Sequence, residues 1–205
     1  MKSENCRLPQ TRTSSAAIRA FVAVPVPAEL KAAIAESQRQ LQARAGTKAV
    51  RWVSAAQWHL TLKFYGNVDS EKLSGLTNAL RAACATAGPF SLSLGGLGSF
   101  PSWQKPSVIW IGIGGDLAAM ANLEKSIEQR TAVFGSRAEK RDFRPHLTVG
   151  RVKGNAHDAR QAGQAIRTQH VPELGKWEVR EIELIQSLLS PQGSSYRSLA
   201  VLPLT

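Results

Sequence analysis

The chain has 205 residues and is 43% hydrophobic, which is ordinary for a globular protein built as one domain or as two small lobes sharing a core. Lysine and arginine number 26 against 15 acidic residues, so the formal net charge is +11. This excess favours nucleic acid or a phosphorylated metabolite as the partner, although dispersed basic charge also serves solubility alone. The longest apolar stretch, residues 108–113, is too short to cross a membrane, and the N-terminus lacks the apolar part of a secretory signal. We therefore expect a cytoplasmic protein with no membrane partner.

The first elements expected along the chain are a tail, a strand and a helix. Residues 1–17 are polar, rich in serine and threonine and without periodicity. They are expected to be a disordered basic tail, followed by a single domain over residues 18–205. The apolar run at residues 21–24 predicts a strand, and Pro27 introduces a helix that stops near Gly46.

The next elements are a strand and a second helix. The strand begins at His59 and is expected to end at Gly66. Asp69 or Ser70 caps the helix, and the spacing of its apolar residues places Cys84 on the buried stripe. This position indicates a core thiol rather than a nucleophile.

The second half of the chain continues the alternation of strands and helices. The pattern predicts strands at residues 90–94 and 108–111, a helix from Asp116 to Gly135, a strand at residues 146–149, a short helix after Asn155, and two strands between residues 177 and 204 around a turn at residues 190–193. Because strands joined by turns alternate with single helices, we expect an α+β fold with antiparallel sheets rather than a doubly wound parallel sheet.

The tripeptide His-Leu-Thr occurs twice, at residues 59–61 and 146–148, and uses two of the four histidines. Side chains in a strand alternate between faces, so each histidine projects with its threonine to one side while the leucine projects into the core. Two such faces offer two proton-transfer groups and two neutral hydrogen-bond donors, without the carboxylate or thiolate ligands of a metal site. This combination indicates metal-free phosphodiester chemistry. The alternative, two buried structural imidazoles, is disfavoured because both copies carry a hydroxyl on the same face.

The two tripeptides belong to a longer internal repeat. The strand at Phe21 begins 38 residues before His59, and the strand at Val108 begins 38 residues before His146. Each half therefore consists of a strand, a helix and a strand that carries histidine and threonine. A period of 87 residues is far too long for a solenoid, so we infer two duplicated lobes related by a pseudo-twofold axis. Such an axis would place the two histidine strands opposite each other.

A family resemblance rests on segments spread from Ile18 to Leu204. The segments are Arg19–Ala23, Arg51–Val53, His59–Gly66, Gly98–Pro101, Val108–Gly112, Phe143–Arg151, and Tyr196 with the strand that follows it. In this order they resemble the RNA 2′,3′-cyclic phosphodiesterases, also called 2′-5′ RNA ligases, of the two-histidine (HxTx) phosphoesterase superfamily. Paired HxTx motifs are specific, whereas a single one is a weak signal. Departures at Trp58, Tyr65 and Gly150 spare every motif histidine and threonine, but Trp58 and Tyr65 could reshape substrate preference.

The resemblance implies a bilobal fold with the histidine strands facing each other across a central cleft. It also implies hydrolysis of a terminal RNA 2′,3′-cyclic phosphate to a 2′-phosphate, with no metal and no cofactor. By resemblance His59 is the general acid and His146 the general base; the sequence itself leaves the assignment open, because either imidazole titrates near pH ~6.5. Thr61 and Thr148 would donate hydrogen bonds to the non-bridging oxygens, and Arg151 would bind phosphate.

Two basic residues depend on how the strands alternate. Arg151 lies five residues after His146, so strict alternation directs it away from the histidine face unless Gly150 permits a bulge or the strand ends there. Lys63, at an even offset from His59, is expected either on the histidine side or simply in solvent.

Aromatic residues and the remaining histidines complete the candidates. Phe100 and Trp103, flanked by proline and glycine in an expected loop, are candidates to stack on a terminal base. Trp110 lies in an apolar strand and is expected in the core. His157 and His170 lack a partner threonine and are expected on the surface.

We therefore expect a monomeric cytoplasmic hydrolase of RNA terminal cyclic phosphates, with tRNA halves as one candidate substrate. Two enzymatic alternatives stay open: small cyclic phosphates such as ADP-ribose 1″,2″-cyclic phosphate as the main substrate, or reversal to 2′-5′ ligation. An alternative of another class is an RNA-binding module without turnover, against which the intact histidines and threonines argue.

Overall fold

The computed structural model describes residues 16–46, 48–135, 142–191 and 193–205. The strands in these ranges are β1 (Ala17–Pro25), β2 (Val50–Trp52), β3 (His59–Asp69), β4 (Phe90–Phe100), β5 (Val108–Gly115), β6 (His146–Val152), β7 (Gly175–Val179), β8 (Glu181–Ser190) and β9 (Gly193–Pro203). The helices are α1 (Ala28–Ala45), α2 (Leu73–Cys84), α3 (Leu117–Arg130) and α4 (Ala156–Ile166), with short 3-10 helices η1 (Ala55–Gln57) and η2 (Ser70–Lys72). Residues 1–15 of the expected tail lie outside the described residues, and its last residue already begins β1.

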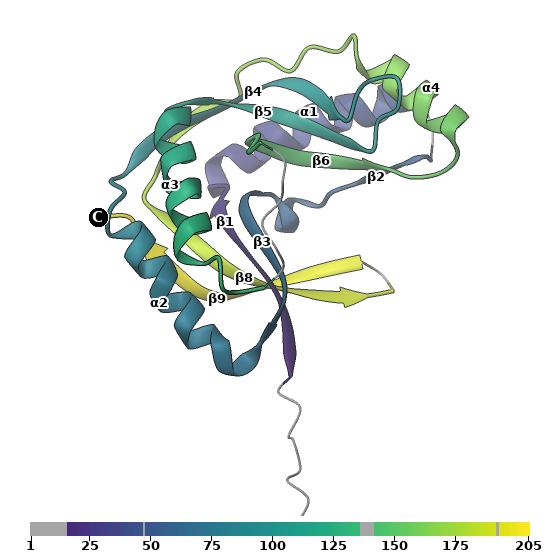
Figure 1. The fold of residues 1–205 in the computed structure, drawn as a ribbon. Coiled ribbons are helices and arrows are strands. Elements are labelled where there is room, and N and C mark those ends of the chain that lie inside the picture. Colours follow the sequence, from purple (N-terminus) through teal and green to yellow (C-terminus); the bar gives the residue numbers. More distant parts are fainter. Residues whose placement is uncertain (1–15, 47, 136–141, 192) are drawn as a thin grey trace, which may run out of the picture.

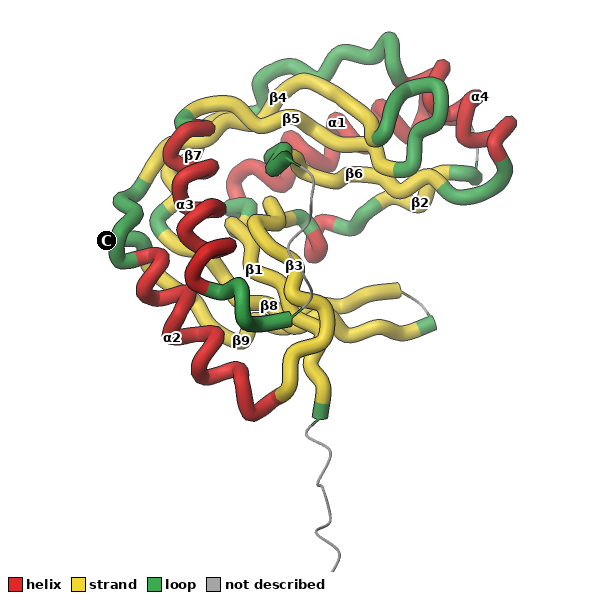
Figure 2. Tube along the Cα trace, viewed as in Figure 1, coloured by secondary structure: helices red, strands yellow, loops and turns green. Residues whose placement is uncertain are grey.

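The strands form two antiparallel sheets, which confirms the predicted α+β class (Figure 1, Figure 2). Sheet A has the order β3-β1-β8-β9, and sheet B has the order β2-β6-β5-β4-β7. In each sheet the strand that begins with a motif histidine, β3 or β6, pairs with the first strand of its repeat, β1 or β5. The backbones of β3 and β6 approach each other from the two sheets, as Figure 1 shows near the centre of the molecule.

The ladders that carry the two motifs have the same register. Phe21 in β1 and Val108 in β5 each pair with the residue five positions after the motif histidine. Both ladders also skip the residue three positions after that histidine, which is Leu62 in β3 and Val149 in β6. A skipped residue is a β-bulge, which shifts the alternation of every side chain beyond it. The two halves therefore share an irregularity as well as their regular elements.

Two predicted boundaries are wrong because tertiary contacts override a local signal. β3 continues beyond Gly66, since Gly66 pairs with Ala20 and the ladder to β1 runs on. α3 ends before Thr131 rather than at Gly135. At this point β3 contacts the chain: the Thr131 hydroxyl accepts from the Tyr65 hydroxyl at 3.1 Å, and the Thr131 carbonyl lies 3.5 Å from Nζ of Lys63.

The C-terminal region forms three strands rather than the two expected. β7 pairs with β4 at the edge of sheet B, whereas β8 pairs with β1 in sheet A. The single residue between them, Arg180, marks the point where the chain passes from one sheet to the other. The predicted turn between β8 and β9 is present, with Ser190 paired to Gly193.

Each sheet is covered by a helix from the opposite repeat. The Gln38 side chain of α1 donates to the Val149 carbonyl of β6 at 3.0 Å, so α1 packs on sheet B. The Glu128 carboxylate of α3 pairs with Lys63 of β3 at 2.9 Å, so α3 packs on sheet A. α2 lies against α3, and α4 lies against α1. No helix in the described part of the chain is long and apolar enough to cross a membrane.

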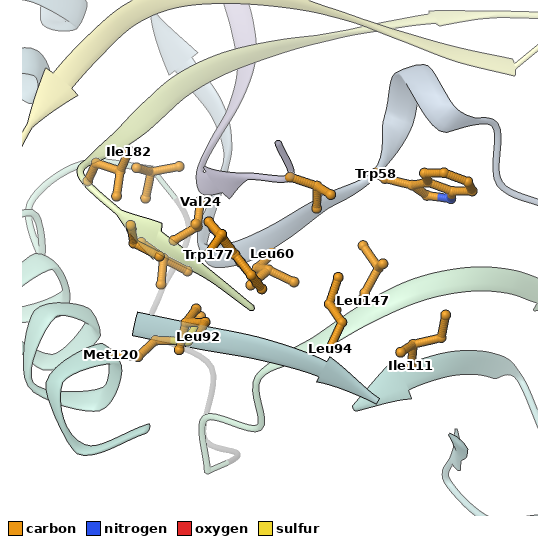
Figure 3. Close-up of a cluster of buried hydrophobic side chains, with 14 of the residues drawn as sticks. Val24, Trp58, Leu60, Leu92, Leu94, Ile111, Met120, Leu147, Trp177 and Ile182 are labelled. Atoms are coloured by element: carbon orange, nitrogen blue, oxygen red, sulfur yellow. The ribbon is translucent and has the colours of Figure 1, made fainter. Parts of the chain in front are cut away.

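One cluster of buried side chains joins the two sheets and their helices. Figure 3 shows Val24 and Leu60 of sheet A beside Leu94, Ile111 and Leu147 of sheet B, all of them fully buried. The leucine of each His-Leu-Thr motif thus projects into the core, as alternation predicts. Because the same core fixes both strands, it also fixes the two histidines relative to each other.

Candidate active site

Each motif histidine opens its strand and is held through the same nitrogen. Nδ1 of His59 donates to the Gln57 carbonyl at 2.7 Å, and Nδ1 of His146 donates to the Arg144 carbonyl at 2.8 Å. A carbonyl only accepts, so Nδ1 carries the proton and Nε2 of the neutral ring keeps a free lone pair. Both rings are therefore oriented to exchange a proton through Nε2.

The two imidazoles and one guanidinium lie within electrostatic reach of one another. Burial is the main cause that lowers the pKa of His59 to about 4, and the charges of Arg151 and His146 lower it further. Burial also lowers the pKa of His146, again with a contribution from Arg151. Since Arg151 acts on the histidine of both strands, the structure brings these three predicted site residues together.

A bulge turns Arg151 onto the histidine face. Val149 has no partner in β5, so the alternation shifts by one residue after Thr148. Arg151 is consequently exposed on the side of His146 rather than directed away from it. Thr148 is partly exposed and Thr61 is exposed, each two residues after its histidine on the same face. The sequence pattern allowed Arg151 on the histidine face only if a bulge interrupted the strand or the strand ended there, and the bulge is present.

The equivalent bulge turns Lys63 away from the site. Because Leu62 is skipped, Lys63 points under β3 toward α3, where its Nζ pairs with Glu128 and lies 3.5 Å from the Thr131 carbonyl. Lys63 is only 7% exposed. Phe64 takes the position on the site face instead. Both expectations for Lys63, on the histidine side or in solvent, are wrong.

Aromatic rings surround His59 on sheet A. The ring centres of Phe21 and Tyr196 lie 4.7 and 5.2 Å from the imidazole. Phe64 stacks along Phe21 and carries the Arg19 guanidinium 4.4 Å above its own ring centre. The rings of Phe21 and Tyr196 thus contribute to the burial that lowers the pKa of His59. Sequence reasoning missed Phe21 and Phe64 as neighbours of the site because apolar residues in apolar strands are typical of a core.

Two aromatic side chains lie beside His146 on sheet B. The ring of Phe100 meets the imidazole edge-on at 5.0 Å, and Trp110 lies 6.4 Å from it. Trp110, expected in the core, instead lies flat over Gly98, where a Cβ would come within 2.0 Å of the indole. Phe100, expected in a loop, is the last residue of β4. Glycine at position 98 therefore creates the room that lets the indole reach the site.

Several residues singled out in the sequence lie away from the site. Trp58 and Tyr65 are buried in the core, so neither presents its ring to the histidine face. Cys84 is buried and its thiol pKa is raised to about 11 by that burial, as expected for a core thiol. His157 and His170 are exposed, as predicted.

The donors gathered at the site are imidazoles, hydroxyls and a guanidinium. Within the described residues, no three side chains of histidine, cysteine, aspartate or glutamate gather where they would hold a metal ion. The arrangement can move protons through two Nε2 atoms and can bind an anion with Arg151. A duplicated α+β fold that presents one histidine strand from each sheet is the architecture of a phosphoesterase of the LigT-like class.

Comparison with known proteins agrees with this class. The LigT-like phosphoesterase profile matches residues 24–110. An RNA 2′,3′-cyclic phosphodiesterase of Archaeoglobus fulgidus is 36% identical over 186 residues, which cover 90% of this chain and 99% of that protein. One from Methanothermobacter thermautotrophicus is 34% identical over 184 residues, which cover 90% and 97%. The chain belongs to the LigT-like phosphoesterase family.

Solved structures of the family share the fold. Escherichia coli LigT complexed with NADP+ superposes with a TM-score of 0.73 at 25% identity, covering 93% of this chain and 99% of that one. A Thermus thermophilus protein superposes with a TM-score of 0.70 at 26% identity, covering 91% and 98%. The similarity therefore extends over both sheets.

Proposed function

We propose that this chain hydrolyses terminal 2′,3′-cyclic phosphates of RNA to 2′-phosphates, using His59 and His146 as an acid and base pair without a metal ion. The observation that carries the proposal is the matched placement of the two imidazoles. Nδ1 of each ring donates to a backbone carbonyl, and Nε2 of each ring keeps its lone pair. The charge of Arg151 contributes to lowering the pKa of both rings. The names of the relatives, RNA 2′,3′-cyclic phosphodiesterases, support the same substrate class.

The base step requires a neutral imidazole. His146 takes a proton from water as the water oxygen bonds to phosphorus, and its lowered pKa keeps the ring neutral at pH 7. The bond from phosphorus to the 3′ oxygen breaks on the opposite side, which leaves the phosphate on the 2′ oxygen. One histidine from each lobe suits this geometry, because attack and departure lie on opposite sides of phosphorus.

The acid step requires a protonated imidazole. A substrate phosphate beside His59 favours the charged ring, since a nearby anion raises the pKa of a cation. Once protonated, the ring donates its Nε2 proton to the departing 3′ oxygen. Thr61 and Thr148 donate hydrogen bonds to the non-bridging oxygens, and Arg151 neutralises their charge.

We propose RNA ends such as those of tRNA halves as substrates, acted on by a monomer in the cytoplasm. The net charge of +11 supports a polyanionic substrate, because it increases the rate at which RNA and protein meet.

The proposal is tested by incubating the protein with an oligoribonucleotide that ends in a 2′,3′-cyclic phosphate, in the presence of EDTA. Release of 2′-phosphate ends is expected. His59→Ala and His146→Ala should each lower the rate by about 10²- to 10⁴-fold, because each removes a proton-transfer group. Thr61→Ala and Thr148→Ala should cost less, because water can partly replace a hydroxyl donor.

The matched control is His157→Ala, which removes an exposed histidine from α4 and should leave the rate unchanged. Binding of the oligonucleotide without conversion would instead favour an RNA-binding module. Loss of activity in EDTA, restored by a divalent ion, would contradict the metal-free mechanism.

A further inference from the structure

A pocket lies outside the histidine site, between the β4–β5 loop and α4. Its volume is about 240 Å³. The lining side chains are an indole, two guanidiniums and two amides, contributed by Trp103, Gln104, Arg160, Gln164 and Arg167. A flat ring beside cations and amide groups is the chemistry that holds a nucleotide, because a base stacks on the ring and a phosphate binds the cations.

The indole in this pocket has a fixed position. Trp103 is partly buried and packs against the main core. The loop lies close to α4 because Gly163 has no side chain: a Cβ there would come within 2.3 Å of the Trp103 carbonyl oxygen. Pro106 packs against the same glycine. A ring held in place loses little conformational freedom when a base stacks on it.

The cations of the pocket are available to a ligand. Arg160 and Gln164 lie four residues apart on one face of α4, and Arg167, the C-cap residue that follows the helix, continues this line three residues further on. All three are exposed, and neither arginine has an ion-pair partner within the described residues. By contrast Arg39 and Arg180 are paired with neighbouring glutamates.

The pocket lies close to the histidine site along the chain. Trp103 follows three residues after Phe100, whose ring touches His146, and three residues span at most about 11 Å. On the other side, β6 runs from His146 to Val152 and carries exposed Arg151, and exposed Lys153 lies in the short connection from β6 to α4. Figure 1 shows the β4–β5 loop beside α4 at the same end of sheet B. Basic side chains therefore lead from one site to the other.

We propose that this pocket binds a nucleotide of the substrate RNA upstream of its cyclic phosphate end, with the base on Trp103 and the backbone phosphates on Arg160 and Arg167. The inference rests on the proposed function, because it places the terminal phosphate at the histidines. It adds a subsite that extends the recognised RNA beyond its last nucleotide. The enzyme should then prefer an oligonucleotide over a single nucleotide through KM rather than through kcat.

The test compares two substrates, adenosine 2′,3′-cyclic phosphate and a hexaribonucleotide ending in 2′,3′-cyclic phosphate. Trp103→Ala is expected to raise KM for the hexanucleotide about tenfold while leaving kcat/KM for the mononucleotide unchanged. Arg160→Gln combined with Arg167→Gln should act in the same way. It should also reduce the slope of log KM against log salt by about 1.4, the value for two phosphate contacts with a single strand.

The control is Lys125→Gln combined with Arg130→Gln, which removes two positive charges from the exposed surface of α3. Because it removes the same number of charges as the arginine double variant, it measures the effect of net charge alone. Its effects on KM for the hexanucleotide and on the slope of log KM against log salt should be smaller than those of the pocket variant. An unchanged KM for the hexanucleotide in both pocket variants would overturn the subsite, as would equal losses on both substrates.

Failure of the proposed function would give a different result. The wild-type chain would then convert neither substrate, and the pocket is still tested by fluorescence anisotropy with a labelled hexanucleotide that carries a plain 2′-phosphate. Weaker binding of this probe by both pocket variants than by the control supports the subsite. Equal binding by all three proteins overturns it.

Discussion

At the scale of single residues, the site depends on how two imidazoles are held and what surrounds them. Each donates through Nδ1 to a carbonyl two residues earlier, which fixes the ring and leaves Nε2 for chemistry. Burial among aromatic rings lowers the pKa of both, and Arg151 lowers both again. The same arginine thus disfavours protonation of both rings, and in the proposed function it also binds the phosphate.

Arg151 should therefore affect both histidines when it is removed. Arg151→Gln is expected to raise the pKa of His59 and of His146, because the cation that disfavours their protonation is gone. NMR titration of the imidazole Hε1 resonances measures both values. The matched control, Lys153→Gln, removes an exposed cation two residues further on and should move them less. If the pKa values of both histidines were the same in Arg151→Gln as in the wild type, Arg151 would not act on the two imidazoles.

Protonation of His59 should destabilise the fold. Its pKa is about 4 in the folded protein and ordinarily about 6.5, so between these pH values the unfolded chain binds a proton that the folded chain does not. The free energy of unfolding should fall as the pH falls through this window. Urea unfolding at pH 6.5, 5.5 and 4.5 should show a smaller loss for His59→Gln than for the wild type. Parallel losses in the two proteins would contradict the burial of the neutral ring.

At the scale of elements, the shared bulge decides which side chains reach the site. The residue four after each histidine is Lys63 in β3 and Gly150 in β6, and both are buried. The residue five after each histidine is Phe64 or Arg151, and both are on the site face. The same bulge, present in both strands, therefore places the aromatic ring of Phe64 on the site face of β3 and the guanidinium of Arg151 on the site face of β6.

The two partners of the Lys63–Glu128 ion pair, which lies under the β3 bulge, should differ in how much their mutation lowers the free energy of unfolding. Glu128→Ala leaves the Lys63 ammonium buried without its counter-ion and should lower the free energy of unfolding by about 3 kcal/mol. Lys63→Met leaves only a carboxylate that is 30% exposed, so the loss should be about 1 kcal/mol or less. Urea unfolding measures both. Lys72→Met, which breaks the exposed pair with Asp69, is the control and should cost less than about 1 kcal/mol. Equal costs for Glu128→Ala and Lys63→Met would contradict this asymmetry.

At the scale of the whole molecule, two repeats are joined so closely that neither sheet stands alone. α1 packs on the sheet of the second repeat and α3 on the sheet of the first. β7 and β8 continue this exchange by joining different sheets with one residue between them. The relative position of the two histidines is consequently a property of the shared core.

A shared core should unfold in a single step. Leu60→Ala in sheet A and Leu147→Ala in sheet B each remove a fully buried side chain and should cost about 3 kcal/mol, or roughly 6–12 °C in Tm. Both should shift one common transition, seen at the same temperature by circular dichroism and by tryptophan fluorescence. Two separate transitions, with each variant affecting only one, would show that the lobes fold independently.

The sequence by itself determined the features that depend on local pattern. Period-two and helical spacing identified most strands and helices and the α+β class, because these patterns reflect which face is buried. The repeated tripeptide and its matched spacing identified His59, His146 and their threonines as candidate site residues. These signals are local, or repeat at a fixed interval, so one chain is enough to show them.

Only the tertiary structure decided which side chains share a face and which sheet each strand joins. A bulge appears when two strands pair, so alternation along β3 alone placed Lys63 on the wrong side and left Arg151 undecided. The passage of β7 and β8 into different sheets, and the position of Trp110 at the site over Gly98 rather than in the core, depend on partners far away in sequence. Such pairings are set by the energy of packing the whole chain, which no short segment contains.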